Sequence, residues 1–288
     1  MTRMRRPSPV SGAWIAALAL VCLAARAGAQ PTLRTVEFSR QLRDTTPLDV
    51  HVDHQAGRIV LHGADAPLLY QAQLAYDPRR SEPLYEYDAA DRRLRIGARR
   101  PAGDAPSGGS PELRLDVART VPVALTIRMG TATADLDLGG MMLTRLSVES
   151  GASDAELHFD TPNAVPMERL ELDVGAASLR ARGLANARAR EVHVKMNVGT
   201  AELDFGGDWT GDIELDLQVT LGKATLRVPA DVGIRVDATR YLASFQRVGF
   251  VRRDDDAYYS DNWDTARRKL HVRSRMVLGQ LELARGAN

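Results

Sequence analysis

Apolar and polar residues alternate along most of the chain beyond residue 110. In one run Leu170, Leu172 and Val174 are separated by acidic residues, and after Gly175 the alternation resumes at Ala177 and Leu179. A period of two residues is typical of a β-strand with one buried face. The glycine between the two runs permits a sharp change of chain direction. This part of the chain is therefore expected to consist of pairs of short strands joined at glycine.

The same unit recurs at a nearly constant spacing. Five successive units align on glycines that lie 21, 24, 24 and 23 residues apart, and related units occur near both ends of the chain. The glycines predicted to turn the chain are Gly57, Gly130, Gly151, Gly175, Gly199, Gly222 and Gly279. A repeat of this length predicts a stacked architecture, because one coil of two strands cannot bury its own apolar face. We expect an all-β fold: a β-solenoid, similar to a β-helix, of two-strand coils with a period of 21–24 residues and an irregular N-terminal β cap.

The regularity of the pattern divides the chain into regions. Residues 30–100 alternate less strictly and predict an N-terminal β subdomain, whereas 112–288 carry the repeats and a C-terminal capping segment. Residues 101–111 are rich in Pro, Gly and Ser, as expected for a linker or a loop. The segment 261–269 is the one place where the sequence suggests a short helix.

Residues 1–29 have the features of a secretory signal peptide. Arginines near the start precede an apolar run over 13–25 and a small-residue site, Ala27-Gly28-Ala29. The apolar run is shorter than the ~20 residues that a membrane-spanning helix needs. Cys22 lies within this run and follows a bulky Val21, which does not favour a lipoprotein anchor. We expect an exported chain that is periplasmic, associated with the cell envelope or extracellular, with no membrane span after cleavage.

Composition narrows the function classes. The 288 residues include 38 basic and 37 acidic side chains and have a formal net charge of +1. This balance provides no basic field for nucleic acid. With 44% hydrophobic residues, the chain is also unlike a disordered tail.

The chain resembles the toast-rack family at both ends. The N-terminal part of the resemblance is Leu48-x-Val50-x-Val52, then Ala56-Gly57-x-Ile59-x-Leu61, then Leu68-Leu69-Tyr70-x-Ala72. The C-terminal part is Val228-Pro229-Ala230-Asp231, then Tyr258-Tyr259-Ser260, then Leu278-Gly279-x-Leu281-x-Leu283, and it is also similar to the LiaF-type cell-wall-active-antibiotics-response domains. The resemblance implies a β-helical, non-catalytic envelope domain. LiaF-type proteins are linked to sensing of envelope stress, but this chain lacks the membrane-spanning helices that accompany that role.

No motif for catalysis, cofactor binding or metal binding is found, so we expect no enzyme, no cofactor and no metal site. Neither a nucleophile elbow, a zinc-protease motif nor a phosphate-binding loop is present. His51 and His54 are three residues apart and on a strand would face opposite sides, which does not favour a shared metal ion.

Acidic residues recur at outward-facing positions of the coils. They are Asp135, Asp137, Glu156, Glu171, Asp173, Glu202, Asp204, Glu214, Asp216 and Glu282. Stacked carboxylates suit Ca²⁺ in principle. Interspersed basic residues such as Arg128, Arg180, Lys195 and Arg227 favour a solvated face with salt bridges.

The most distinctive segment is 254–264, where carboxylates adjoin aromatic residues. The residues expected to form a ligand or partner surface are Asp254, Asp255, Asp256, Tyr258, Tyr259, Asp261, Asn262 and Trp263. The alternative interpretation is an aromatic plug that covers the last coils, because the ends of a stack need caps.

The sequence therefore predicts a non-catalytic, exported envelope protein that acts as a structural or binding module. The expected partner is an unidentified envelope protein or a glycan. Two further functions are considered: a polysaccharide-binding or polysaccharide-active β-helix, and an accessory protein of an envelope stress response.

Overall fold

The computed structural model describes residues 33–65, 67–99, 111–245, 249–253 and 255–286, and it confirms the all-β prediction. The predicted signal peptide and almost all of segment 101–111 lie outside these residues. Residues 31–288 form one compact unit. Its fifteen strands are β1 (Arg34–Gln41), β2 (Leu48–Ala64), β3 (Leu68–Tyr76), β4 (Glu82–Asp88), β5 (Arg93–Arg99), β6 (Glu112–Ala118), β7 (Pro122–Asp137), β8 (Met142–His158), β9 (Arg169–Arg182), β10 (Glu191–Asp204), β11 (Ile213–Pro229), β12 (Gly233–Phe245), β13 (Phe250–Arg252), β14 (Tyr258–Ser260) and β15 (Lys269–Gly286).

Each long strand contains two inward-facing runs that meet at a corner. In β11 the buried side chains recur every second residue from Ile213 to Val219 and again from Ala224 to Val228. The five-residue step from Val219 to Ala224 reverses the phase of the alternation. Equivalent five-residue steps occur from His54 to Ile59 in β2 and from Met276 to Leu281 in β15.

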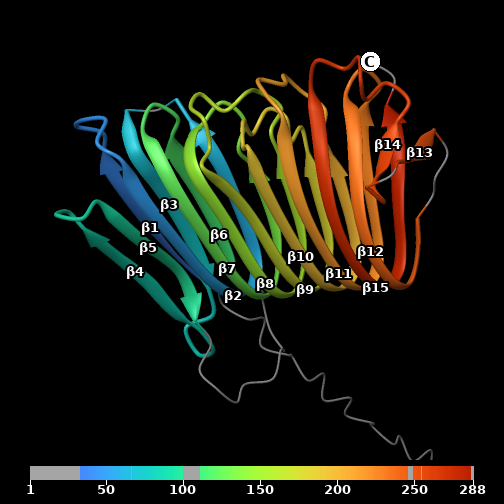
Figure 1. The fold of residues 1–288 in the computed structure, drawn as a ribbon. Coiled ribbons are helices and arrows are strands. Elements are labelled where there is room, and N and C mark those ends of the chain that lie inside the picture. Colours follow the sequence, from blue (N-terminus) through green and yellow to red (C-terminus); the bar gives the residue numbers. More distant parts are fainter. Residues whose placement is uncertain (1–32, 66, 100–110, 246–248, 254, 287–288) are drawn as a thin grey trace, which may run out of the picture. The chain divides into compact units, whose positions relative to one another are not determined.

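The long strands bend back on themselves at these corners. β7 and β8 run parallel, yet only four residues separate Asp137 from Met142. Four residues span at most ~14 Å, whereas a straight strand as long as β7 would extend ~50 Å. The two halves of each strand must therefore face each other, with their apolar side chains between them. Figure 1 shows the strands curving round at one edge of the stack and the loops gathered at the other.

The coils stack in parallel and in register, with the predicted period. Met129 of β7 pairs with Ser150 of β8, Ser150 pairs with Val174 of β9, and this column continues through Met196 to Val219. The successive offsets of 21, 24, 22 and 23 residues agree with the expected 21–24. The buried side chains of all the coils form one continuous apolar core.

Glycine occupies two different positions at the corners. Gly130, Gly151 and Gly175 directly follow the last inward residue of the first run, whereas Gly199 and Gly222 lie two residues further on. Gly199 consequently pairs with Ala177 and not with Gly175. At Gly222, φ is +152°, and a Cβ atom there would lie 2.0 Å from the Gly199 carbonyl oxygen. Gly222 is therefore required there for both backbone conformation and space.

The N-terminal region shares the sheet of the repeats. The first half of β2 pairs with β5 and the second half with β6, while the whole of β2 pairs with β7 on its other side. β5 and β6 thus form one coil together. Antiparallel β4 covers one half of this coil, and β3 followed by β1 covers the other. These strands form the expected irregular cap.

The C-terminal strand enters the sheet out of chain order. β15 lies between β11 and β12, which are consecutive in the sequence, and it pairs in parallel with both. β14 and β13 then add antiparallel to the start of β12. The expected helix over 261–269 is not formed, because residues 261–265 make successive turns, in which Trp263 donates to the Ser260 carbonyl and Thr265 to the Asn262 carbonyl.

Candidate functional site

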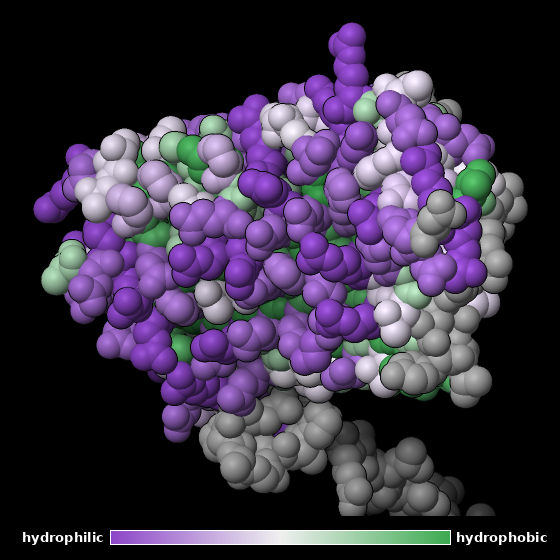
Figure 2. Space-filling view, viewed as in Figure 1, coloured by the Kyte–Doolittle hydropathy of each residue, from purple (hydrophilic) through white to green (hydrophobic). Residues whose placement is uncertain are grey.

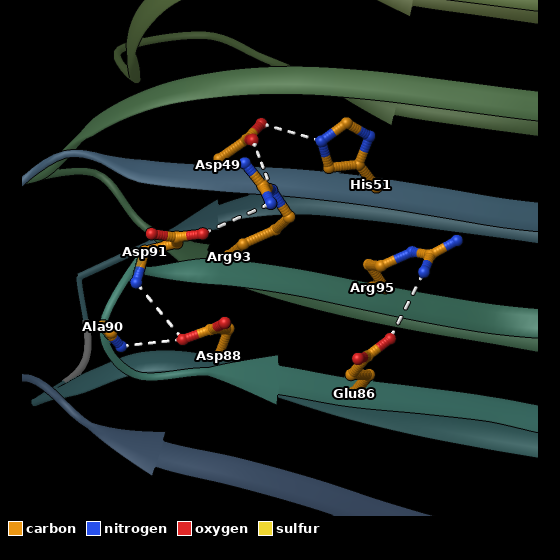
Figure 3. Close-up of polar contacts among 8 residues, drawn as sticks. All are labelled: Asp49, His51, Glu86, Asp88, Ala90, Asp91, Arg93 and Arg95. Carbon is orange, nitrogen blue, oxygen red and sulfur yellow. Dashed lines mark hydrogen bonds and ion pairs between the residues drawn. The ribbon is translucent and has the colours of Figure 1, made fainter.

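Charged side chains cover the outward faces of the coils. Figure 2 shows hydrophilic residues over most of the face that it displays, with apolar residues between them. Figure 3 shows the pattern at the N-terminal end, where Arg93 bonds to Asp49 at 3.0 Å and Arg95 to Glu86 at 3.3 Å. Partial burial opposes ionisation of Asp49, but hydrogen bonds from Arg93 and His51 outweigh it and lower the pKa of that carboxyl group.

Most of the predicted acidic positions form ion pairs with basic side chains. Pairs that join neighbouring coils at these positions include Arg58–Asp135, Arg180–Glu156, Lys195–Asp173, Arg227–Glu202, Lys223–Glu282 and Arg273–Glu214, and Arg128–Glu149 is a further pair of the same kind. Their side chains are about a third to two thirds exposed, so each pair contributes little to stability. The ladder is thus a solvated, charge-paired surface. No group of three or more potential metal ligands occurs among the described residues.

The outer surface is hollowed where β2, β7, β8 and β9 turn their corners. Two adjoining cavities of about 410 and 500 Å³ share Thr133 and Asp154 in their lining, and together we call them the polar trough. The hollow exists because the corner residues are small. Ala152 pairs with Ala176 and Ala176 with Val198, so the aligned side chain becomes bulky only at β10.

The polar trough presents hydroxyl groups between two ion pairs. Arg58 lies 3.5 Å from Asp135 at one end, and Arg180 lies 3.0 Å from Glu156 at the other. Between them Asp154 is exposed and forms no hydrogen bond or ion pair with the described residues. The exposed or half-exposed residues Thr131, Thr133 and Ser178 complete the polar lining. The arrangement can donate and accept hydrogen bonds along a strip four coils wide.

The segment predicted as a ligand surface is brought together as a self-contained network. Tyr258 and Tyr259 are buried, and the Tyr259 hydroxyl donates to Asp255 at 2.5 Å. This hydrogen bond lowers the pKa of Asp255 and raises that of Tyr259. Asp256 pairs with Arg252 at 2.8 Å, while Asp254 lies outside the described residues.

The same segment is fastened to the end of the stack. The Asn262 amide donates to the carbonyls of Ala230 and Val232 and accepts from Arg285 at 2.9 Å. Trp263 packs edge-on against Tyr259 with ring centroids 5.2 Å apart. Burial lowers the pKa of the Arg285 guanidinium, although the charge of the nearby Asp261 favours its protonated form. These contacts favour the plug interpretation, and a role of this surface in binding stays a prediction.

Two buried asparagines fix the loops, and the alternation pattern of the sequence does not point to them. Asn163 accepts from the Leu143 amide and donates to the Leu143 carbonyl, both at 2.8 Å. Asn186 donates to the Phe159 carbonyl and accepts from Asp208, both at 2.7 Å. The only hint in the sequence is an asparagine at similar places in consecutive loops.

The largest pKa shifts of the described residues lie in the interior and not in the trough. Burial raises the pKa of Tyr70, whose hydroxyl is hydrogen bonded to that of Tyr85 at 2.8 Å. Burial lowers the pKa of His54 to about 4.

Among the described residues, no helix is long and apolar enough to cross a membrane.

The fold defines the class of protein as an all-β stack of parallel coils with antiparallel caps. Residues 29–164 match the N-terminal domain of toast_rack, DUF2154. This match supports the assignment to the toast-rack family that the sequence patterns predicted. A search of curated proteins gives no match.

A search of solved structures finds matches at low sequence identity. A candidate cell adhesion protein from Clostridium sporogenes ATCC 15579 is 14% identical, with 88% of this chain and 100% of that chain covered and a TM-score of 0.45. A candidate adhesin from Bacteroides fragilis NCTC 9343 is 8% identical, with 89% and 100% covered and a TM-score of 0.30. A candidate adhesin from Parabacteroides distasonis ATCC 8503 is 9% identical, with 88% and 98% covered and a TM-score of 0.33.

Proposed function

We propose that this chain is a non-catalytic binding module of the cell envelope, exported by the signal peptide at residues 1–29, and that the polar trough contacts a protein partner. The observation that carries the proposal is the trough itself, a hollow about four coils wide on a surface that is otherwise covered by charge pairs. Rigid, in-register coils hold its side chains in place, so little conformational freedom is lost on binding.

The lining of the trough favours a protein over a neutral glycan. Both signs of charge are present, with Arg58 and Arg180 beside Asp135, Asp154 and Glu156. Complementary charges of both signs give a protein interface its register and specificity. No aromatic side chain is among the described residues that line it, so it offers no flat apolar ring on which a sugar can stack.

The proposal predicts site-specific capture of one partner in cells. A photo-crosslinking residue replaces Thr133 in the trough or, as the control, Thr200, which is also exposed but lies at the corner of β10. We expect one envelope protein to be captured from position 133 and not from position 200. We also expect Asp154→Arg to reduce that capture several-fold, because it reverses the charge between the two ion pairs.

The captured protein, once purified, should bind the wild-type chain and bind Asp154→Arg at least about tenfold more weakly, which corresponds to ~1.4 kcal/mol. Equal capture from both positions, or equal affinity of the variant, contradicts the assignment of the trough. Binding of a purified neutral glycan in the absence of any protein capture would support the polysaccharide-binding alternative instead.

A further inference from the structure

A separate cavity lies at the loop edge of the stack, opposite the corners. It has a volume of about 440 Å³ and is formed by the connections that follow β8, β9 and β10, together with the first residue of β11. It shares no lining residue with the polar trough. A cavity of this size suits a small organic molecule.

Two arginines line this cavity and lack a carboxylate partner. Arg188 and Arg190 form no ion pair or side-chain hydrogen bond with the described residues, and the Nε atom of Arg188 is buried without an acceptor. A buried guanidinium N–H without an acceptor costs free energy, so an acceptor supplied by a ligand would be favourable there.

The backbone conformation of Arg188 is a second observation in favour of a binding site in this cavity. Its φ is +54°, a conformation that is uncommon for residues other than glycine. Arg92 adopts the same conformation with φ of +52°, but its guanidinium donates to the Thr46 carbonyl at 2.9 Å and pairs with Asp44 at 3.3 Å. The backbone therefore holds Arg188 in a strained conformation while its head group stays without such contacts.

The loop that carries the arginines is held firmly. Arg188 donates its backbone N–H to the Ala185 carbonyl at 3.2 Å, and its own carbonyl accepts from Met167 at 3.1 Å. The neighbouring Asn186 is buried and hydrogen bonded on both sides of its amide. The two arginines thus project from a preorganised loop, as a binding site requires.

The rest of the lining defines the ligand. Pro166, Ala185, Ala189 and Ile213 provide apolar surface. Among the described residues of the lining, Asp212 is the one carboxylate, and one of its oxygen atoms accepts the Lys269 backbone N–H at 2.9 Å. A negative charge there disfavours a dianion and leaves net attraction for a monoanion.

We propose that this cavity binds a small monocarboxylate with an apolar body, whose carboxylate accepts hydrogen bonds from Arg188 and Arg190. Arginine suits this role because its planar fork matches the geometry of a carboxylate. The proposal is independent of the partner assigned to the trough.

Calorimetric titration of the purified protein with sodium hexanoate tests the proposal, with hexanamide as the uncharged analogue and inorganic phosphate as the alternative anion. We expect saturable binding of hexanoate, and no binding of hexanamide. Phosphate should bind at least tenfold more weakly than hexanoate. Arg188→Gln and Arg190→Gln should each weaken hexanoate binding about tenfold or more, because each removes a charge-assisted hydrogen bond.

Arg182→Gln is the matched control, since Arg182 is an exposed arginine at the end of β9 that does not line the cavity. It should leave the affinity unchanged within twofold. Thermal unfolding of each variant shows whether it is folded, and Arg190→Gln provides the decisive comparison if Arg188→Gln does not fold. Absence of saturable hexanoate binding, equal binding of hexanamide, tighter binding of phosphate, or unchanged affinity in folded Arg190→Gln would overturn the proposal.

Discussion

His54 places a titratable ring inside the apolar interior. Its side chain is fully buried next to the corner of β2, and neither ring nitrogen has a partner with full hydrogen-bond geometry among the described residues. Desolvation disfavours the charged imidazolium and lowers its pKa to about 4, although the nearby Pro111 backbone and Asp53 favour the charged form. The folded protein therefore keeps His54 neutral under conditions in which the unfolded chain would protonate it.

This makes stability depend on pH. The ordinary pKa of this side chain is 6.5, whereas its pKa in the folded protein is about 4. Between these two pH values the unfolded state binds a proton that the folded state does not bind. The free energy of unfolding therefore falls as the pH falls through this range. At pH 5 the loss amounts to about 2 kcal/mol relative to pH 8. His54→Leu should remove this contribution, and His62→Gln, at a half-exposed position, should retain it. Urea unfolding at pH 8 and pH 5 measures the difference, and an equal loss in His54→Leu would show that other groups cause it.

At the scale of the strand, the close approach of neighbouring coils at the corner limits which side chains fit at the corner positions. The second corner position brings the backbone of one coil against that of the next, as at Gly222 and Gly199. A side chain at Gly222 would collide with a carbonyl oxygen that belongs to the hydrogen-bonded sheet and cannot move away independently.

Gly222→Ala should therefore lower the free energy of unfolding by roughly 3 kcal/mol or more, because it combines a steric collision with a left-handed backbone. Gly211 provides the matched control, since a Cβ atom there would meet nothing within 4 Å. Gly211→Ala should change the unfolding free energy by no more than about 0.5 kcal/mol. Similar losses for both variants in chemical denaturation would contradict this account of the corner.

The strands were predictable because alternation is a local signal. The exact pairing of the corners was harder to predict from the sequence, because glycine occurs at either of two corner positions. Alignment on glycine matches Gly175 with Gly199, but in the structure Gly199 pairs with Ala177. The polar trough was not predicted at all. It depends on small residues of separate coils, such as Ala152 and Ala176, lying side by side, and no short segment of sequence contains that information.

At the scale of the whole sheet, chain order and strand order differ at both ends. β2 lies between β6 and β7, and β15 lies between β11 and β12. Local pattern gives the strands but not these neighbours, because parallel strands with the same alternation are interchangeable in sequence. The family resemblance included sequence from β2 and from β15, but it did not specify which strands these two would pair with.

β15 should be indispensable for the C-terminal part of the fold. It pairs with β11 over residues 270–286 and with β12 over residues 269–281, and it contributes the buried side chains Leu270, Val272 and Met276. A chain that ends at Arg268 should lose cooperative thermal unfolding and aggregate through the open strand edges. The control, ending at Gly286, retains all of β15 and should behave as the wild type. A monomeric, cooperatively unfolding product of the shorter truncation would contradict this expectation.

The same interlocked ends limit how such a protein can change in length during evolution. An extra coil added beyond β2 or β15 would not extend the stack, because each of these strands is enclosed on both sides by strands that adjoin each other in the sequence. From β7 to β11, by contrast, sequence order and spatial order coincide, and within the described sheet β8, β9 and β10 each pair only with the strand before and the strand after in the sequence. Duplication or loss of a 21–24-residue segment there preserves both caps, so the interior coils are the part of the gene in which length can vary without rebuilding the ends.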